Sequence, residues 1–159
     1  MATPLKGLST FDNEQLPDGT DLKIGIVVAD WNREITGKLL QGARKTLQIL
    51  GVSESDIQVQ NVPGSFELTF AAKLMAETEE VDAVISFGCV VKGETPHFDY
   101  ICQSVTYGLT ELNLSYDIPF IFGVLTTLNQ QQALDRAGGK YGNKGDEAAI
   151  AAVQMARIN

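Results

Sequence analysis

The sequence predicts a three-layer α/β domain, in which helices cover both faces of a parallel β-sheet. Apolar, β-branched segments typical of buried strands alternate with segments of helical periodicity, a rhythm that favours parallel strands joined by right-handed crossovers. The 159 residues suit one domain with a sizeable core, and no internal repeat, low-complexity tract or linker divides them. We therefore expect an extended arm over residues 1–21 and a single domain over residues 22–159.

The first strand and helix show this pattern clearly. Residues 22–29, LKIGIVVA, are apolar on both faces, which predicts a strand buried on both sides. Residues 34–50 follow with apolar side chains at near-helical spacing and predict an amphipathic helix. Asn32 suits the N-cap of this helix, and Gly51 is placed to end it.

The same cycle repeats along the rest of the chain. Further apolar segments predict strands at residues 57–62, 81–91 and 119–126. Segments of helical periodicity predict helices at residues 65–78, 97–112, 130–138 and 146–158. Together with the first unit, they give a four-stranded parallel sheet with helices on both sides.

Charge and hydropathy exclude several classes of partner. Twelve Lys and Arg against twenty Asp and Glu give a net charge of −8, which argues against a nucleic-acid surface or an anionic membrane. A small anionic ligand is still compatible with this charge, because local cations and helix N-termini can bind it. No apolar run approaches the roughly 20 residues that span a bilayer, and the first residues lack a signal-peptide pattern. We therefore expect a cytoplasmic protein.

The two cysteines, Cys89 and Cys102, form no cluster with metal-ligand spacing. Nothing in the sequence suggests the disulfide framework of a secreted protein. We expect reduced, buried thiols and no metal site.

Polar and glycine-rich segments follow the predicted strands at their carboxyl ends, where open parallel sheets bind ligands. These segments are residues 30–32, 63–67, 92–97 and 126–127. The only tryptophan, Trp31, and the only histidine, His97, therefore fall on the same edge of the sheet as a glycine-rich turn. The residues alone predict a polar pocket for a phosphorylated small molecule at this edge.

Several of these residues have a structural interpretation beside the functional one. The turn of Gly93, Glu94 and Thr95 can cradle phosphate with backbone N–H groups, but glycine is also common in such turns for steric reasons. His97 can cap a helix or pack in the core, or it can transfer protons at neutral pH. Trp31 can anchor the core or offer a surface for stacking.

Three charged residues are open to the same double interpretation. Glu67, early in a predicted helix, can bind a ligand or simply complement the helix dipole. Arg136 and Lys144 can be ligand-binding cations or solvated surface charges.

Five segments resemble, in order and spacing, the 6,7-dimethyl-8-ribityllumazine synthase family. They are VPGSFE, VVKGETPHFDY, FGVLT, QALDRAGGKYGNKG and AAVQMA, and the resemblance runs from about residue 22 to residue 157. It implies a flavodoxin-like fold and the penultimate step of riboflavin synthesis. In that step, a transferase reaction, 5-amino-6-(D-ribitylamino)uracil condenses with 3,4-dihydroxy-2-butanone 4-phosphate, and phosphate and water are released. The family needs no metal or organic cofactor.

The resemblance also implies an assembly. Members form homopentamers, which in some cases pack into icosahedral shells, and each active site lies between two neighbouring subunits. The arm of residues 1–21 would pair with the sheet edge of a neighbour, and riboflavin synthase would be a partner protein.

The same resemblance assigns roles to individual residues. The pyrimidine and ribityl contacts fall on Trp31, Asn32, Ser65, Phe66, Glu67, Val90, Val91, Lys92, Phe122 and Lys144. The phosphate contacts fall on Gly93, Glu94, Thr95 and Arg136. Trp31 would stack on the pyrimidine, and Phe122 and Lys144 would come from a neighbouring subunit. His97 matches the proposed proton shuttle of the family.

Two residues depart from the family pattern. Tyr141 stands where many members carry histidine, so a second imidazole role is absent, and Glu94 replaces a smaller residue, which could weaken phosphate affinity. Two other function classes stay open. A flavodoxin-like binding module would also use Trp31 to stack on a flavin or lumazine. A shell protein that has lost the chemistry would not need His97, Arg136 and Lys144.

Overall fold

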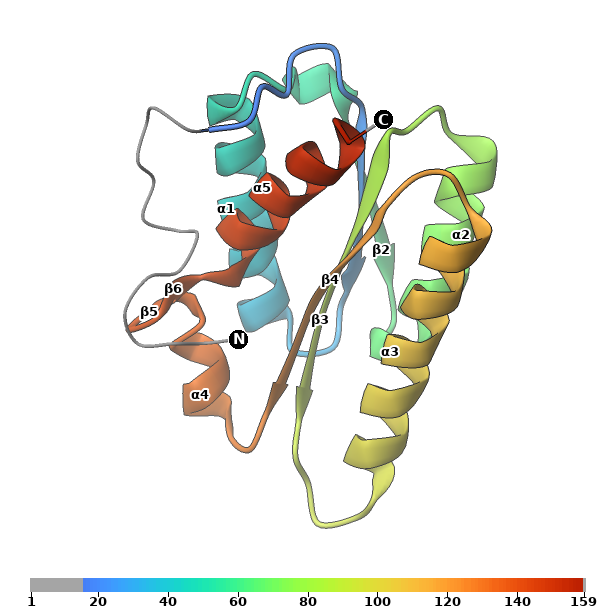
Figure 1. Cartoon of the computed structure of the whole chain (residues 1–159). Helices are drawn as coiled ribbons and strands as arrows, with labels where there is room; N and C mark the ends of the chain where they lie inside the picture. The colour runs from blue at the N-terminus through green and yellow to red at the C-terminus, as the bar shows by residue number, and fades with distance from the viewer. Residues whose placement is uncertain (1–15, 159) are drawn as a thin grey trace.

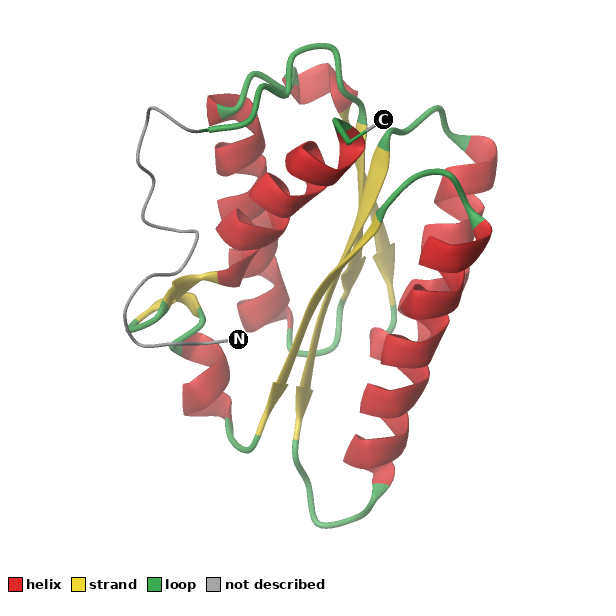
Figure 2. Cartoon of the chain, in the orientation of Figure 1, coloured by secondary structure: helices red, strands yellow, loops and turns green. Residues whose placement is uncertain are grey.

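The computed structural model describes residues 16–158, so most of the expected N-terminal arm lies outside the described residues. A four-stranded parallel sheet in the order β2-β1-β3-β4 is flanked by helices on both faces (Figure 1; Figure 2). The predicted three-layer α/β/α fold with a flavodoxin-like parallel sheet is therefore confirmed. No helix in the described part of the chain is long and apolar enough to cross a membrane.

The strands lie within two residues of their predicted starts. Their bounds are β1 Ile24–Ala29, β2 Ile57–Val62, β3 Ala83–Val91 and β4 Phe120–Thr127. Every residue of β1 is buried, as its apolar side chains on both faces predict. All four strands point the same way, so their carboxyl ends meet at the lower end of the molecule in Figure 1.

In the described part of the chain, five α-helices pack around the sheet. Their bounds are α1 Arg33–Ile49, α2 Leu68–Thr78, α3 His97–Ser115, α4 Gln130–Leu134 and α5 Lys144–Ala156. Short 3₁₀ turns, η1 Glu54–Asp56 and η2 Ser65–Glu67, precede β2 and α2. Residues 65–67, predicted as the start of the second helix, therefore form a tighter turn that leads into it.

The predicted helix over residues 130–138 is wrong beyond Leu134. Ala137–Gly139 forms β5, which pairs antiparallel with β6, Gly142–Asn143. Gly138 and Gly142 have φ values of 98° and 75°, which a helix cannot contain. The side-chain oxygen of Asn143 then accepts from the backbone N–H of Gly145, so α5 begins two residues earlier than predicted.

Two hydrophobic clusters hold the layers together. One joins the sheet to α1 and α5 and the other joins it to α2 and α3. Adjacent β3 residues point to opposite faces, so Ile85 packs with Leu39 of α1 while Val84 packs with Leu109 of α3. Burying each such side chain contributes about 1.5–3 kcal/mol, and this packing fixes the strand ends that carry the functional residues.

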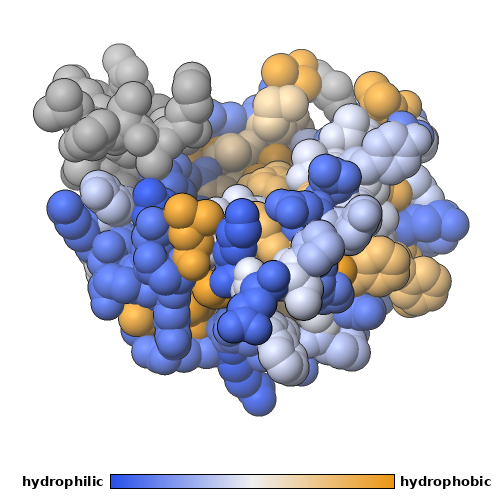
Figure 3. Space-filling view, turned by 90° about the horizontal axis from the view of Figure 1, so that it is seen from below, coloured by the Kyte–Doolittle hydropathy of each residue, from blue (hydrophilic) through white to orange (hydrophobic). Residues whose placement is uncertain are grey.

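The view from below shows the end of the molecule where the strands finish (Figure 3). Hydrophilic and hydrophobic residues are interspersed on this face rather than segregated. Polar side chains therefore lie next to apolar ones at the edge of the sheet where the sequence predicts a pocket.

Candidate active site

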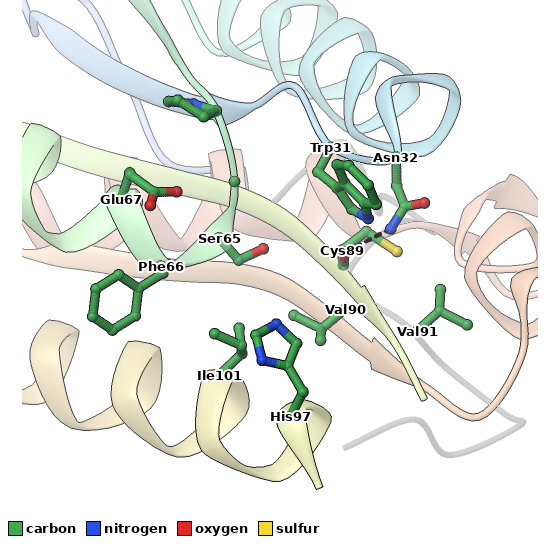
Figure 4. Close-up of a pocket in the computed structure, with 12 residues that line it drawn as sticks. Trp31, Asn32, Ser65, Phe66, Glu67, Cys89, Val90, Val91, His97 and Ile101 are labelled. Atoms are coloured by element: carbon green, nitrogen blue, oxygen red, sulfur yellow. Dashed lines mark hydrogen bonds between the residues drawn. The ribbon is translucent and has the colours of Figure 1, made fainter. Parts of the chain in front are cut away.

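A pocket of about 590 Å³ opens at the carboxyl ends of β1, β2 and β3, beside the first turns of α3 (Figure 4). Its lining residues are Trp31, Asn32, Pro63, Gly64, Ser65, Phe66, Glu67, Cys89, Val90, Val91, His97 and Ile101. The structure thus brings the only tryptophan and the only histidine of the chain to one cavity.

The β1–α1 turn supplies Trp31 and Asn32. Trp31 is 73% exposed, so it does not anchor the core, and its ring lies at the pocket (Figure 4). Asn32 has a left-handed backbone, with φ 61° and ψ 42°, which turns the chain sharply from β1 into α1. The backbone N–H of Trp31 donates to the carbonyl of Pro63 at 3.0 Å, which ties this turn to the segment after β2.

The expected N-cap role of Asn32 is only half right. Asn32 occupies the N-cap position of α1, but its side chain makes no capping hydrogen bond there. Instead its Nδ2 donates to the backbone carbonyl of Cys89 at 2.8 Å (Figure 4). The last paired residues of β1 and β3 are Val28 and Phe87, so this side-chain bond continues the link between the two strands beyond their ladder.

The β2–α2 segment forms the second wall. Ser65 is buried, whereas Phe66 is 60% exposed at the pocket rim. Gly88 of β3 leaves room for this turn, because a Cβ there would lie 2.5 Å from Ser65 Oγ. Glu67 precedes α2 and lines the pocket, so its carboxylate complements the helix dipole and is also available to a ligand.

The β3–α3 segment forms the third wall. His97 is the first residue of α3 and is exposed, which rules out a core histidine. Ile101, one turn further along the same helix, lines the pocket beside it (Figure 4). Val90 and Val91 are half-buried, and the backbone N–H of Lys92 donates to the carbonyl of Thr127 at 2.8 Å, which anchors the start of the turn.

The predicted phosphate turn lies next to the pocket without lining it. Gly93, Glu94 and Thr95 are all exposed. Lys92, predicted as a pyrimidine or ribityl contact, is exposed as well and does not line the pocket. Gly93 lacks a positive φ, and a Cβ built on it would meet nothing within 4 Å. Packing within the chain therefore gives no reason for glycine at this position.

The two thiols differ in their surroundings. Cys89 is 1% exposed and its backbone lies at the pocket, and burial raises the pKa of its thiol to about 11. This thiol stays protonated at neutral pH and is a poor nucleophile. Cys102 is only half-buried, so the expectation of a buried thiol is wrong there. Burial, and next the charge of Asp99, raises its pKa.

Three predicted site residues lie away from this pocket. Phe122, on β4, lines a separate groove with Cys102 and Tyr107 of α3. Arg136 lies between α4 and β5, and Lys144 begins α5 with its Nζ 2.8 and 2.7 Å from the two carboxylate oxygens of Glu147. A single chain therefore does not bring these three residues to the cavity that holds His97.

Sequence reasoning missed Cys89 and Ile101 as pocket residues. Ile101 lies four residues after His97, a spacing that places both on one helix face, so that signal was present. No such signal was present for Cys89, because its place at the pocket depends on where the pairing of β1 with β3 ends. Among residues 16–158, no group of three His, Cys, Asp or Glu side chains could hold a metal ion.

Comparison with known proteins gives the same family description for a family model and for several similar proteins. The family model for 6,7-dimethyl-8-ribityllumazine synthase matches residues 21–159. A 6,7-dimethyl-8-ribityllumazine synthase of Parabacteroides distasonis is 61% identical over 159 residues, which cover 100% of this chain and 99% of that protein. The protein of the same name from Porphyromonas gingivalis is 59% identical over 158 residues, covering 99% and 98%. That from Bacteroides fragilis is 58% identical over 134 residues, covering 84% and 94%.

Proposed function

Because the chain belongs to the 6,7-dimethyl-8-ribityllumazine synthase family, we propose that it condenses 5-amino-6-(D-ribitylamino)uracil with 3,4-dihydroxy-2-butanone 4-phosphate. The products are 6,7-dimethyl-8-ribityllumazine, phosphate and water. The enzyme would act as a transferase in the penultimate step of riboflavin biosynthesis, in the cytoplasm.

The observation that carries this proposal is the meeting of Trp31 and His97 in one cavity, from positions 66 residues apart in the sequence. One side chain offers an aromatic face and the other a group that both accepts and donates protons. The cavity of about 590 Å³ is within the roughly 300–1,000 Å³ range of small-molecule sites. Such a cavity suits a planar heterocycle that must be stacked while protons move.

The substrate with the pyrimidine ring is assigned to the walls of the pocket. Trp31 stacks on the ring, which its exposure at the pocket mouth permits. Ser65 and Glu67 face the polyol chain, because a hydroxyl and a carboxylate suit a row of hydroxyl groups. The backbone of Val90 and Val91 lines the ring edge. Phe66, at the rim, covers the apolar part of the ligand.

The chemistry is assigned to His97. Imine formation, phosphate elimination, tautomerisation and ring closure each move a proton, and one imidazole can serve several of these steps in turn. The first turn of α3 holds the imidazole at the cavity. The amine and the ketone already react slowly by themselves, so holding them in contact is the other large part of the task.

The phosphate is assigned to the exposed turn of Gly93, Glu94 and Thr95 together with Arg136. Backbone N–H groups and a planar guanidinium bind phosphate oxygens well and stabilise the charge of the departing group. The lack of any packing reason for Gly93 supports this role, because glycine then serves close approach of a ligand.

The active site is proposed to lie between two subunits of a homopentamer. The assembly is either this pentamer or an icosahedral shell of such pentamers, and riboflavin synthase is the candidate partner protein. Phe122, Arg136 and Lys144 lie outside the pocket of their own chain, and they would complete the pocket of a neighbour. Light scattering on the purified protein measures the size of the assembly. A monodisperse monomer with full activity would contradict an intersubunit site.

The two substrates, mixed with the protein, test the reaction directly through the fluorescence of the lumazine product. His97→Ala is expected to lower kcat by about 10²–10⁴-fold but to leave a residual rate. Asp99→Asn, on the same exposed helix turn but outside the pocket, is the matched control and should change the rate little. A wild-type rate equal to the uncatalysed rate would instead indicate a module that only binds a flavin or lumazine.

Arg136→Ala tests the phosphate assignment. It should raise KM for the phosphorylated ketone more than KM for the pyrimidine, because only the former carries the anion. An unchanged KM for the ketone would place its phosphate elsewhere.

A further inference from the structure

The β5–β6 hairpin lies on the opposite side of the sheet from α3 (Figure 1). At this hairpin, Arg136 and Tyr141 lie against each other. The guanidinium carbon of Arg136 is 4.9 Å from the centre of the Tyr141 ring, within the range of a cation–π contact. Both residues are partly buried, so the contact is shielded from water on one side.

The backbone fixes both partners of this contact. The N–H of Tyr141 donates to the carbonyl of Asp135 at 2.7 Å, which folds the hairpin back over the residue before Arg136. The N–H of Lys144 donates to the carbonyl of Arg136 at 2.8 Å, so the far end of the hairpin is tied to the same place. The backbone segments that carry the Tyr141 ring and the Arg136 guanidinium are therefore held close together.

The guanidinium itself is held from a second direction. Its η1 nitrogen donates to the carbonyl of Gln132, within α4, at 2.8 Å. This bond uses one of the five N–H donors of the group. With one edge bonded to α4 and one face on the Tyr141 ring, the orientation of the remaining donors is fixed before any ligand arrives.

We propose that Tyr141 is a positioning residue, which holds the Arg136 guanidinium in the orientation that receives the phosphate of the substrate. The inference rests on the proposed function for the identity of the anion. A guanidinium that is already oriented loses less conformational freedom when it binds phosphate with two parallel hydrogen bonds. Removing the ring should therefore weaken phosphate binding while leaving the charge in place.

The test compares Tyr141→Leu with Tyr141→Phe in the two-substrate assay. Tyr141→Leu should raise KM for the phosphorylated ketone by about two- to fivefold, which is the effect expected from the loss of a partly exposed cation–π contact. KM for the pyrimidine should stay within about twofold of the wild type. Tyr141→Phe keeps the aromatic face and should restore the KM for the ketone.

Lys140→Ala is the matched control, because Lys140 Nζ lies 5.1 Å from the centre of the same ring. This variant removes the other cation of the hairpin but leaves Arg136 on its ring. Its KM for the ketone should stay near that of the wild type, and urea unfolding of each variant checks that the hairpin change leaves the fold intact.

A double-mutant cycle separates positioning from a merely structural role. Once Arg136→Ala has removed the guanidinium, adding Tyr141→Leu should raise KM for the ketone no further, because the ring then has nothing to orient. Additive effects, or an unchanged KM in Tyr141→Leu alone, would overturn the inference.

Titration calorimetry with inorganic phosphate decides the role of Tyr141 apart from the reaction. The wild-type protein and Tyr141→Phe should bind phosphate alike, and Tyr141→Leu should bind it about two- to fivefold more weakly. Equal phosphate affinity in all three proteins overturns the inference even where lumazine is formed. Absence of lumazine with the expected loss of phosphate affinity would overturn the proposed reaction and leave the role of Tyr141 standing.

Discussion

Asn32 combines two features that a pair of substitutions can separate. Its backbone is left-handed, with φ 61°, and its side-chain amide donates to the Cys89 carbonyl at 2.8 Å. In the folded protein, Asn32→Gly keeps the backbone conformation at no steric cost and removes only the side-chain bond. Asn32→Ala removes the same bond and in addition forces an alanine into the left-handed region.

The two variants should differ by an amount that the structure predicts. Loss of one hydrogen bond costs about 1 kcal/mol, and the greater freedom of glycine in the unfolded chain adds about 0.5 kcal/mol, so Asn32→Gly should lose about 1.5 kcal/mol. For Asn32→Ala the strain of the left-handed backbone adds about 1.5 kcal/mol to the lost bond, which gives about 2.5 kcal/mol. With a slope of about 2 kcal/mol per molar urea, the two midpoints should lie about 0.5 M apart.

Urea unfolding at one fixed protein concentration measures this difference, because association with other copies would otherwise shift the midpoint. Asp21 is the matched control, since it is the other non-glycine residue of the described chain with a positive φ, 64°. Asp21→Ala and Asp21→Gly should show the same gap between alanine and glycine. Equal midpoints for Asn32→Ala and Asn32→Gly would refute the account of the backbone, and wild-type stability in Asn32→Gly would refute the account of the side-chain bond.

Further predictions concern packing, pH and the thiols. Gly88→Ala would place a Cβ 2.5 Å from Ser65 Oγ, so it should lower the free energy of unfolding by about 1–3 kcal/mol; wild-type stability in urea would contradict this. Burial is the main cause that raises the pKa of Asp146 above 3.8. The ionised carboxylate of Asp146 therefore destabilises the folded protein relative to the protonated carboxyl. Asp146→Asn should therefore raise the urea midpoint at pH 7, and this gain over the wild type should shrink as the pH falls toward 3.8. A gain that grows on acidification would contradict a raised pKa of Asp146. Mass spectrometry after maleimide treatment at pH 8 should find Cys102 labelled before Cys89, because Cys89 is 1% exposed with a thiol pKa of about 11; equal labelling would contradict its burial.

The layers of the fold followed from local patterns. Residues 57–62, IQVQNV, were predicted as a strand and β2 has the same bounds, because a short segment that contains β-branched residues and is flanked by turn residues has few alternatives. The alternation of strands and helices then fixed the parallel sheet, since right-handed crossovers leave little choice of topology.

The hairpin after α4 could not be predicted in the same way. Helical periodicity runs through residues 130–138, but β5 and β6 pair with each other through only a few residues, which is too short a stretch for a strand pattern. The left-handed glycines that make the turn are visible only as glycines in the sequence.

The candidate site was predicted where it depended on strand ends and missed where it depended on distant contacts. Trp31 and His97 follow directly after β1 and in the first turn of α3, so topology alone brought them together. The bond from Asn32 to Cys89 joins residues 57 positions apart, and no local pattern encodes it. The contact of Arg136 with Tyr141 likewise depends on the fold of the hairpin.

The single indole of this chain is also a spectroscopic probe. Trp31 is the only tryptophan and stands 73% exposed at the rim of the cavity, so the whole tryptophan emission of the protein originates beside this cavity. A ring that covers this indole should quench the emission or shift it to the blue, without any label attached. Occupancy of the cavity can therefore be followed in the native protein. For each variant that keeps Trp31, the emission of the ligand-free protein is the reference.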